Sequence, residues 1–355
     1  LKIIFFIFFI FIAIIAWNYK GPKIHFKNYE KKVKTIQIFG VHYAQDLLME
    51  LGEKNCEDSS RYEILKSDDI EDADIYILNF NQHSSFMKKY SNTIKSKYKK
   101  ILIVHSIESP NSVIVQNFDY QKSQQYFVHW IISYYQNSFL YIPYGYYEKA
   151  EKIKNIDKNV RKWFFQRKNA ALAIISNCYF AETIRLEYIV ELKKYYAVDT
   201  FGACYTKTLS DYERLIALSE YKFYLSFENT QCDQYITEKY WEVIKYGIIP
   251  IVMGFGTKIN GLIPESFINV FDFPNPKSLA HYLHILSTNE NEYSRYHQWR
   301  KYYYSHEYKA DSCKILSKIT EALQKPISED PTVYLLGDKS NCLSIQSMKK
   351  ELLKT

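Results

Sequence analysis

The residues best placed for chemistry lie where one apolar stretch ends and the next expected helix begins. Residues 221–227 are mostly apolar or aromatic and predict a buried strand, which is followed at once by Glu228. After a short loop, Thr237 predicts the N-cap of a helix, because its hydroxyl can accept a hydrogen bond from a first-turn amide. The free amides of that helix start, with Lys239 beside them, suit an anion such as a diphosphate. This segment therefore predicts a nucleotide-binding site.

Glu238, in the same first turn, extends this prediction to the sugar of a nucleotide. Its carboxylate can accept two hydrogen bonds from vicinal ribose hydroxyls, as acidic residues do in other nucleotide-binding folds. Gly247 predicts the end of the helix, and residues 248–252 predict a following strand. A capped helix with a surface Glu–Lys pair would explain the same residues without a ligand, because a lone Thr-Glu-Lys turn is a weak signal.

The elements that must position this segment alternate between strands and helices. Such alternation is typical of an α/β protein with parallel sheets. Strands are expected at 35–39, 74–78, 101–105, 139–143, 170–176, 197–201, 221–227, 248–253 and 268–272, and helices at 183–195, 210–220, 237–246 and 278–287. The charged stretch 149–168 separates two such series and predicts a domain boundary. Ligands of these sheets bind at the carboxyl ends of the strands, so a cleft between the domains is the expected site.

Length and composition limit the classes of protein to which the chain can belong. The 355 residues suffice for two domains, and 47% apolar with 24% charged residues argues for a packed core and against disorder. A net charge of +7 with many aromatic residues also fits a nucleic-acid binder, but the lysines are scattered, so this interpretation is weak. The six cysteines form no CxxC pair, and no Asp-x-Asp pair follows a predicted strand, so no metal site is predicted. An even cysteine count permits disulfides.

Residues 1–17 form an apolar run in which Lys2 is the single polar residue. As a helix the run spans about 25 Å, enough for a thin bilayer. We interpret it as an uncleaved signal anchor, because it exceeds a typical signal-peptide core and no small-x-small cleavage site follows. A cleaved signal peptide is the alternative. Residues 18–34 are polar and basic and predict a stem, although their lysines taken alone would favour a cytosolic position.

Around the nucleotide segment the chain resembles the α-1,3/4-fucosyltransferase family. The resemblance rests on residues 223–229, Asp233, residues 235–239 and residues 247–254. Further matches follow in the family's order and bring its coverage to residues 35–310: Ile107-Glu108-Ser109-Pro110, Trp130, Ser133-Tyr134, Ile142-Pro143-Tyr144-Gly145, Ser176-Asn177-Cys178, Arg185, Tyr188, Leu192 and residues 198–202.

The chain departs from the family pattern in two places. The family usually has Tyr-Arg-Arg-Asp-Ser where residues 134–138 read Tyr-Tyr-Gln-Asn-Ser, which removes two cations and a carboxylate. Residues 255–257 stand where a proline-containing turn is common. The first difference bears on affinity for donor or acceptor rather than on the fold.

The resemblance implies a GT-B fold, with two facing Rossmann-like domains, a cleft between them, and GDP-fucose as the donor. The organisation expected from sequence and resemblance together is a signal anchor at 1–17, a stem at 18–34, an acceptor-side domain at 35–160, a GDP-fucose-binding domain at 161–325 and a tail at 326–355. No cofactor is required on this reading, although members of the family can respond to a divalent cation.

The resemblance also implies a catalytic base and a phosphate ligand. Glu108 matches the family's proposed base, which would deprotonate the attacking hydroxyl as the anomeric carbon inverts. Arg185 matches a ligand of the β-phosphate, through a bidentate contact. An ordinary loop carboxylate and a surface arginine of an amphipathic helix are the alternatives for these two residues.

The remaining donor-binding roles fall on the nucleotide segment. Lys239 would share the phosphate charge and Glu238 would hold the ribose. Asn229 and Tyr235 would line the donor pocket or be buried for structural reasons, and Glu228 would contact the fucose or support its neighbours.

The expected function is that of an inverting glycosyltransferase that moves L-fucose from GDP-β-L-fucose to a GlcNAc hydroxyl, with α-1,3 as the family's default linkage. A lactosamine GlcNAc and the core GlcNAc of an N-glycan, on a glycoprotein or glycolipid, both stay open as acceptors. A non-catalytic relative that binds a nucleotide sugar or glycan is the alternative. With residues 1–17 in the membrane, the expected location is the Golgi membrane, as a single-pass type II protein with a lumenal catalytic part. No nucleic-acid partner is expected.

Overall fold

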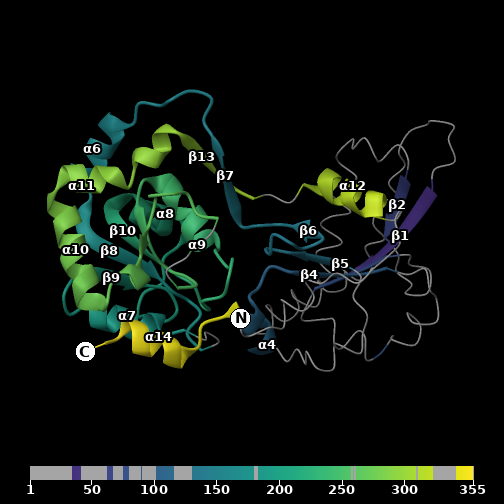
Figure 1. Ribbon diagram of the computed structural model, residues 1–355, viewed down its shortest axis with the longest axis horizontal. Helices are drawn as coiled ribbons and strands as arrows, with labels where there is room; N and C mark the ends of the chain where they lie inside the picture. Colours follow the sequence, from purple (N-terminus) through teal and green to yellow (C-terminus); the bar gives the residue numbers. More distant parts are fainter. Residues whose placement is uncertain are drawn as a thin grey trace, which may run out of the picture.

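The computed structural model describes residues 34–40, 62–66, 75–79, 89, 101–115, 130–179, 183–256, 259, 261–308, 311–322 and 341–354. The predicted anchor at 1–17 and all but the last residue of the predicted stem at 18–34 lie outside the described residues. Among the described residues, no helix combines the length and apolar character needed to cross a bilayer. Two parallel sheets, each in a separate unit, and a two-stranded ribbon between them make up the architecture (Figure 1).

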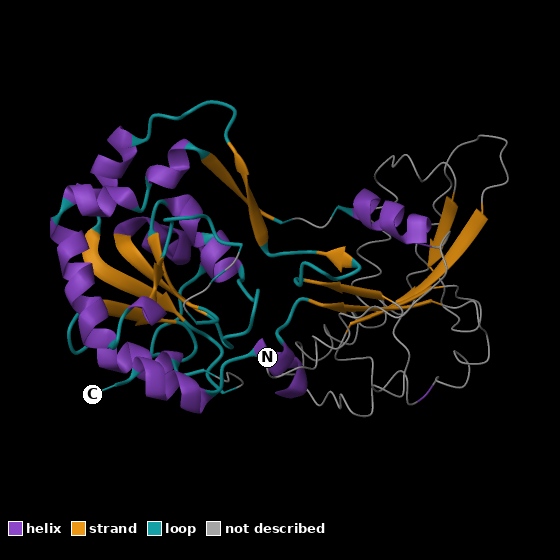
Figure 2. Cartoon of the chain, in the orientation of Figure 1, coloured by secondary structure: helices purple, strands orange, loops and turns teal. Residues whose placement is uncertain are grey.

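The sheet of the first domain has six parallel strands in the order β2-β1-β3-β4-β5-β6. Figure 2 shows its strands in orange, apart from those of the second domain. They are β1 (Lys34–Gly40), β2 (Tyr62–Lys66), β3 (Ile75–Asn79), β4 (Ile101–Ser106), β5 (Trp130–Ser133) and β6 (Leu140–Tyr141). All six residues of β4 are buried, as expected for a central strand of a parallel sheet covered on both faces. The helix α4 (Pro110–Val115) begins a few residues after β4 ends.

The sheet of the second domain has five parallel strands in the order β12-β11-β10-β8-β9. They are β8 (Lys168–Ile174), β9 (Val198–Phe201), β10 (Tyr221–Phe227), β11 (Ile249–Met253) and β12 (Ile268–Asn269). The chain passes from β8 to β9 on one side and then crosses to β10 on the other side of β8. The order therefore reverses between β8 and β10, and a crevice at the carboxyl ends of these strands is where such sheets bind ligands.

Helices cover both faces of the second sheet. One face packs on α6 (Asp157–Gln166), α7 (Arg185–Leu192), α10 (Pro276–Thr288), α11 (Glu290–Arg295) and α14 (Ile345–Leu352). The other face packs on α8 (Asp211–Glu220), α9 (Glu238–Trp241) and the 3-10 turn η2 (Val243–Tyr246). Two further 3-10 turns are η3 (Val270–Asp272) and η4 (Gln298–Lys301). The result is the doubly wound layer order predicted for a Rossmann-like domain.

An antiparallel ribbon of β7 (Gly145–Lys149) and β13 (Tyr303–Glu307) lies beside the second sheet, toward the first domain (Figure 1). The chain leaves the first domain through β7 and returns to it after β13. The helix α12 (Ser312–Ala322) then packs Ile315, Leu316 and Ile319 into the core of the first sheet. The ribbon is thus the double connection between the two domains.

Packing differs from the predicted domain bounds of 35–160 and 161–325 in two places. α6 crosses the predicted boundary, yet both Val160 and Phe164 belong to the second core. α12 was assigned to the second domain and belongs to the first. The physical reason is that the apolar face of α12 covers a sheet far away in sequence, and no local composition change marks that return. In the predicted tail at 326–355, Met348 and Leu352 are buried in the second core.

Two disulfides join loops of the second domain. Cys178 pairs with Cys204, which ties the loop after β8 to the loop after β9. Cys232 pairs with Cys342, which ties the loop after β10 to the C-terminal segment. Cys313 is disulfide-bonded as well. The described part of the chain contains no free cysteine.

The predicted helix at 237–246 is interrupted. It consists of one α-helical turn, α9, followed by the 3-10 turn η2. Thr237 is the N-cap as predicted, and Gly247 has the left-handed φ of 71° expected of a residue that ends a helix. A side chain at Gly247 would collide with the ring of Trp163, so close packing also requires glycine there. So short a helix has a weak dipole, because the peptide dipoles sum over few residues.

Candidate functional site

A cavity of ≈ 290 Å³ opens between the two domains, at the reversal of strand order in the second sheet. The first domain contributes Glu108, from the loop after β4, and Tyr144, from the start of the ribbon. The second domain contributes the larger share: Ile174, Ile175, Ser176, Asn177, Arg185, Arg214, Tyr224, Asn229, Tyr235, Glu238 and Lys239. Six of the seven residues predicted for the site therefore line one cavity.

Glu228 is the predicted residue that does not line it. Its side chain is 2% exposed, and its oxygens accept hydrogen bonds from the amide and hydroxyl of Thr237, each at 2.9 Å. Lys239 Nζ lies 3.2 Å from Glu228 Oε2. Burial raises the pKa of Glu228, and the charge of Lys239 opposes that shift. Glu228 thus fixes Thr237 and Lys239 at the start of α9. This fits a role in supporting its neighbours and not a direct contact with a sugar.

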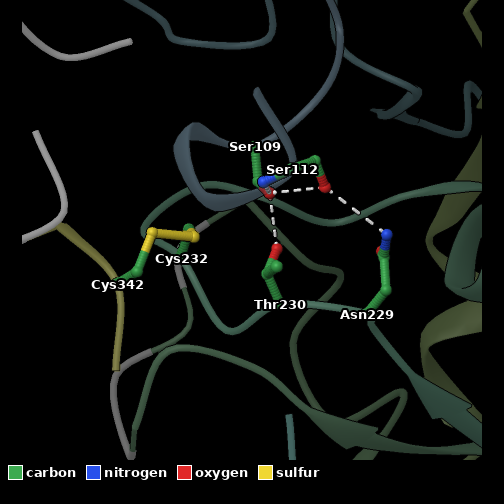
Figure 3. The surroundings of a disulfide bond; sticks show 6 residues. All are labelled: Ser109, Ser112, Asn229, Thr230, Cys232 and Cys342. Carbon is green, nitrogen blue, oxygen red and sulfur yellow. Dashed lines mark hydrogen bonds between the residues drawn. A yellow bond between two sulfur atoms is a disulfide. The ribbon is translucent and has the colours of Figure 1, made fainter. Parts of the chain in front are cut away.

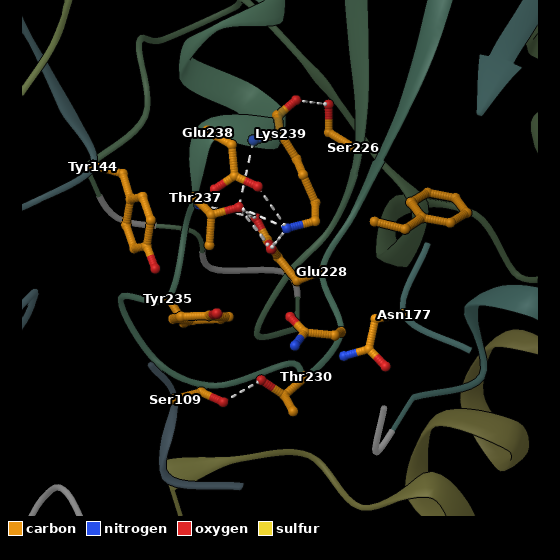
Figure 4. Close-up of polar contacts among 12 residues, drawn as sticks. Ser109, Tyr144, Asn177, Ser226, Glu228, Thr230, Tyr235, Thr237, Glu238 and Lys239 are labelled. Carbon is orange, nitrogen blue, oxygen red and sulfur yellow. Dashed lines mark hydrogen bonds and ion pairs between the residues drawn. The ribbon is translucent and has the colours of Figure 1, made fainter. Parts of the chain in front are cut away.

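Lys239 lies at the centre of the charged wall (Figure 4). Its ammonium contacts Thr237 Oγ1 at 3.1 Å, Glu238 Oε1 at 3.0 Å and Glu228 Oε2 at 3.2 Å. Burial alone would lower its pKa, but the two carboxylates outweigh burial and raise it. The backbone of Lys239 is fixed as well, because its carbonyl accepts from the hydroxyl of Ser226 at 2.7 Å. Lys239 is therefore a permanent cation at the cavity wall.

Glu238 is the more exposed of the two carboxylates around that lysine. Its side chain is 53% exposed and lines the cavity. Burial acts to raise the pKa of Glu238, but Lys239 outweighs it, so the pKa is lowered. An ionised carboxylate at the surface of a cavity can accept hydrogen bonds from hydroxyl groups of a ligand. The surface Glu–Lys pair considered from the sequence does exist, but it faces this cavity.

Arg185, the first residue of α7, is 2% exposed, so it is not a surface arginine. Its guanidinium donates to the carbonyl of Phe227 at 3.2 Å and to that of Asn177 at 2.5 Å. Phe227 is the last residue of β10, and Asn177 lies in the loop that follows β8. Both acceptors are therefore at the carboxyl ends of the two strands between which the strand order reverses. Burial lowers the pKa of Arg185, and the charge of Glu228 opposes the shift. Nε has no hydrogen-bond partner. The side chain therefore brings a buried positive charge to the cavity while it joins two loops.

Glu108 and Tyr235 meet across the cavity from opposite domains. The hydroxyl of Tyr235 donates to Glu108 Oε2 at 3.0 Å. Burial, then the neighbouring Tyr144 and Glu108, raise the pKa of Tyr235 well above its usual value, so this hydroxyl keeps its proton. Tyr144 packs edge-on against the ring of Tyr235, with centroids 6.2 Å apart, and donates to the carbonyl of Ile107 at 2.7 Å. One carboxylate is thus presented at the domain boundary in a fixed orientation.

A set of hydroxyl contacts joins the same two loops deeper in the molecule (Figure 3). Thr230 donates to Ser109 Oγ at 2.6 Å, and Ser109 donates to Ser112 Oγ at 3.1 Å. Asn229 Nδ2 lies 3.5 Å from Ser112 Oγ. The disulfide of Cys232 is close by in sequence and anchors the far side of this loop. The loop that carries the donor-side residues is therefore bonded directly to the loop that carries Glu108.

Tyr144, Arg214 and Tyr224 are among the cavity residues to which sequence reasoning assigned no role. Tyr144 did appear in a matched motif, which was a signal for the first domain. Arg214 forms a two-fold contact with Glu242, with both nitrogen–oxygen distances 2.5 Å. It lies on α8, and no local pattern distinguishes it from an ordinary helix arginine. Only the packing of α8 beside α9 places it at the cavity.

The run at 134–138, where the chain departs from the family pattern, is packed and not solvated. Tyr134 and Tyr135 are buried and stacked, with ring centroids 4.5 Å apart. Tyr134 also packs edge-on against Tyr235 at 5.2 Å. The amide of Gln136 donates to Gln234 Oε1 at 3.0 Å, across the domain boundary. Here aromatic packing and one hydrogen bond hold the domains where charged side chains stand in the family pattern.

Within the described ranges, no group of three or more His, Cys, Asp or Glu side chains is arranged to hold a metal ion. The charged residues that line the cavity are three cations, Arg185, Arg214 and Lys239, and two carboxylates, Glu108 and Glu238. Such a set can bind a diphosphate at the cations, hydroxyl groups at Glu238, and a proton from an incoming alcohol at Glu108.

Comparison with known proteins finds relatives among the fucosyltransferases. Residues 164–332 match the family model for the C-terminal part of glycosyltransferase family 10, the fucosyltransferases. Glycoprotein 3-alpha-L-fucosyltransferase A of Drosophila melanogaster is 34% identical over 181 residues, 49% of this chain and 36% of that protein. Alpha-(1,3)-fucosyltransferase 4 of Bos taurus is 34% identical over 177 residues, 48% of this chain and 44% of that protein. The chain spans less than half the length of these relatives.

The fold also has a solved counterpart. A crystal structure of an alpha1,3-fucosyltransferase with GDP-fucose superposes with a TM-score of 0.54 over 86% of this chain and 95% of that one, at 19% identity. This likeness establishes the fold, a GT-B-like arrangement of two α/β domains. The resemblance inferred from the nucleotide segment is confirmed.

Proposed function

We propose, from the premise that residues 164–332 form a domain of the glycosyltransferase family 10 fucosyltransferases, that this chain is an inverting fucosyltransferase. It would transfer L-fucose from GDP-β-L-fucose to a GlcNAc hydroxyl of a glycan, through an α-1,3 linkage. The donor is supported by the GDP-fucose bound in the solved counterpart, and the linkage by the names of the relatives.

One observation carries the proposal: the carboxylate of Glu108, from the first domain, lines the same cavity as Lys239, Arg185 and Glu238 of the second. A base and a cationic diphosphate site on opposite walls are what an inverting transfer needs. The acceptor oxygen bonds to the anomeric carbon as the bond to the β-phosphate oxygen breaks. GDP leaves, and the hydroxyl proton goes to Glu108. Tyr235, whose hydroxyl donates to Glu108, orients that carboxylate and leaves its other oxygen for the proton.

Lys239 would stabilise the departing diphosphate after an exchange of partners. An ammonium has three N–H donors, and Thr237, Glu238 and Glu228 now accept all three. Glu228 is buried and fixed, whereas Glu238 is exposed and can move. When the donor binds, Glu238 would turn to the ribose hydroxyls and release one donor of Lys239 to the phosphate. With α9 so short, Lys239 and Arg185 supply most of the positive charge, and the helix dipole supplies little.

The other donor contacts follow from the cavity walls. Asn229 and Tyr235 line the donor side of the cavity. Glu228 does not line it and supports Thr237 and Lys239 through its hydrogen bonds and ion pair. This chemistry uses no cofactor. Stimulation by a divalent cation, which would bind the diphosphate of the donor, stays a prediction.

We infer a glycan on a glycoprotein or glycolipid as the acceptor, with a lactosamine GlcNAc and the core GlcNAc of an N-glycan as the two candidates. We also propose that residues 1–17 anchor the chain in the Golgi membrane as a single-pass type II protein with a lumenal catalytic part. The apolar run supports the anchor. The disulfides Cys178–Cys204 and Cys232–Cys342 support the lumen, because disulfides persist in oxidising compartments.

An assay of GDP release tests the activity. The full chain, solubilised in detergent, is incubated with GDP-fucose and a mixture of lactosamine and N-glycan-core acceptors. Acceptor-dependent GDP release that Glu108→Gln abolishes is the expected result. GDP binding without release, insensitive to Glu108→Gln, would instead identify a non-catalytic relative, the alternative raised by the altered run at 134–138. Protease protection in sealed microsomes tests the location, and digestion of the folded domain from the cytosolic side would refute it.

A further inference from the structure

The ribbon of β7 and β13 carries a row of rings on one face. His306 pairs with Tyr146 and Tyr304 pairs with Glu148. The amide of Tyr308 donates to the carbonyl of Tyr144 at 3.0 Å, which extends the pairing by one step toward the cavity. Side chains alternate between the two faces of a strand, and directly paired residues share a face. Tyr146, Glu148, Tyr304 and His306 therefore lie on one face, and we call the rings Tyr146, Tyr304 and His306 the ring row.

The opposite face of the ribbon is already closed by packing. A side chain at Gly145 would lie 2.3 Å from the ring of Trp241. Tyr147 and Tyr303 pack edge-on with centroids 5.2 Å apart, and both pack against the core of the second domain. The face that carries the ring row is thus the outward one.

The ring row is half exposed and mixes rings with charged groups. Tyr146 and Tyr304 are 45% and 46% exposed. Tyr146 is stacked on His306, with centroids 5.0 Å apart and planes 20° from parallel. The ammonium of Lys154 lies 3.0 Å from the centroid of Tyr304, and Glu148 lies 2.9 Å from His306. Flat apolar rings that alternate with hydrogen-bonding groups match the two kinds of surface on a sugar: an apolar ring face and a rim of hydroxyls.

Tyr144, two residues before Tyr146 in the chain, lies where the ribbon meets the cavity. Tyr144 lines the cavity together with Glu108, and its hydroxyl is held by the carbonyl of Ile107. From Tyr144 to the position of Glu148 the strand extends about 13 Å, at roughly 3.3 Å per residue, which is longer than one sugar ring. An oligosaccharide whose reacting sugar lies beside Glu108 would meet Tyr144 first and the ring row beyond it.

We propose that the ring row is a binding subsite for the sugars of the acceptor beyond the one that receives fucose. The identity of the transferred group rests on the proposed function, whereas the binding itself does not. The ligand is a neutral oligosaccharide, held by stacking on Tyr146 and Tyr304 and by hydrogen bonds to His306, Glu148 and Lys154. A short acceptor occupies only the cavity, and a longer acceptor also uses the row.

The test compares short and long acceptors on the full chain. The short acceptors are N-acetyllactosamine and chitobiose, and the long ones are a hexasaccharide of three lactosamine repeats and the trimannosyl-chitobiose pentasaccharide. The variant is Tyr146→Ala combined with Tyr304→Ala. The matched control is Tyr195→Ala, a tyrosine with 43% exposure beyond the far end of α7. We expect the KM of the long acceptor to rise about tenfold in the double variant. The KM of its short partner, kcat and GDP-fucose hydrolysis without acceptor should change less than twofold.

An equal loss for the short and long acceptors, or no loss for either, would overturn the ring row as a subsite. Failure of the proposed function looks different, because the wild-type chain would then release no GDP with any acceptor. In that case saturation-transfer NMR with the hexasaccharide and the pentasaccharide, in the presence of GDP, decides on binding alone. Signals that weaken in the double variant and not in Tyr195→Ala support the subsite, and unchanged or absent signals reject it.

Discussion

Cations lie near both ends of strand β10, in opposite electrostatic settings. At the carboxyl end, Lys239 lies between Glu228 and Glu238, and these carboxylates raise its pKa in spite of burial. At the amino end, Lys222 donates to the carbonyl of Ser287 at 2.9 Å and lies 4.0 Å from the ring centroid of Phe164. Burial lowers the pKa of Lys222 to about 8.

At the amino end of β10, the cations donate hydrogen bonds to backbone carbonyls. Arg167 donates to the carbonyls of Tyr221 and Tyr246, and Arg300 donates to that of Ile244. Two of these acceptors are carbonyls of η2, where the end of a helix leaves carbonyls without a partner in the next turn, and that of Ile244 also accepts from the amide of Gly247. Burial lowers the pKa of Arg300 to about 9 and also lowers that of Arg167. In the described part of the chain, neither Arg167 nor Arg300 forms an ion pair with a carboxylate.

The comparison teaches what distinguishes a ligand site from a structural cation cluster in one strand–helix unit. Burial by itself acts against the charge of a cation and is present at both ends. Only the carboxyl end adds carboxylates that restore the charge, and one of them, Glu238, is exposed and can be displaced. A cluster of this kind can exchange a protein partner for a ligand, whereas the amino end has no such partner to exchange.

Removal of the proposed base should have the largest effect. We expect Glu108→Gln to lower the rate of fucosyl transfer by about 10²–10⁴, the usual contribution of a positioned base. The affinity for GDP should not change, because this residue belongs to the opposite wall. Steady-state kinetics and calorimetric GDP titration measure the two quantities. A variant that lost GDP affinity and rate in equal proportion would show that Glu108 acts on the donor, and the proposed division of the walls would be wrong.

Removal of the Lys239 charge, near the carboxyl end of β10, should have the second largest effect. We expect Lys239→Met to weaken GDP binding roughly 100-fold, about 3 kcal/mol, because a charge-assisted contact to the diphosphate is lost. Calorimetric titration with GDP measures it. Lys245→Met is the control, since Lys245 lies in η2 and pairs with Glu307, away from the cavity. Similar affinities for both variants would refute the ligand role of Lys239.

A change of Lys222, at the amino end of β10, should alter the stability of the fold and not the affinity for GDP. The pKa of Lys222 is lowered to about 8 in the folded chain from an ordinary 10.5. The unfolded chain therefore binds more protons between these values, so the free energy of unfolding should rise as the pH increases from 8 to 10. We expect the rise to amount to at most about 2 kcal/mol after allowance for solvent screening. It should be absent in Lys222→Met.

Urea denaturation at a series of pH values measures this difference, with wild type and Lys222→Met compared at each pH. GDP affinity should be equal in the two proteins. A stability difference that does not depend on pH would mean that Lys222 keeps its proton in the folded state, and the contrast between the two ends would then fail.

The smallest effect should come from the hydroxyl contact that joins the two walls. Thr230→Val keeps the shape of the side chain and removes the 2.6 Å hydrogen bond to Ser109. We expect a loss of about 1 kcal/mol, seen as a roughly fivefold lower kcat. GDP affinity should stay constant, because the donor wall is intact. Thr230→Ser restores the hydroxyl and should recover kcat. No recovery would show that packing of the methyl group, and not the hydrogen bond, aligns the walls.

Local patterns were enough to predict the centre of the second domain. Thr237 is the predicted N-cap, Gly247 ends the helix with a left-handed conformation, and the strands at 221–227 and 248–253 are present within one residue. Each of these features depends on a few neighbouring residues: a hydroxyl that can cap, a residue without a side chain, an apolar stretch of strand length. The family motif added Glu108 and Arg185, which local chemistry did not single out.

The sequence by itself thus determined the α/β class, the position of the cap, and the identity of the charged residues around Glu238 and Lys239. The tertiary structure decided which of these groups face a ligand. It buried Glu228 beneath Thr237, turned Arg185 from a candidate surface residue into a buried one, and returned α12 to the first sheet. The reason is physical: a charge and a cap are properties of short segments, whereas burial and orientation depend on surfaces contributed by residues more than a hundred positions apart, as in the contact of Glu108 with Tyr235.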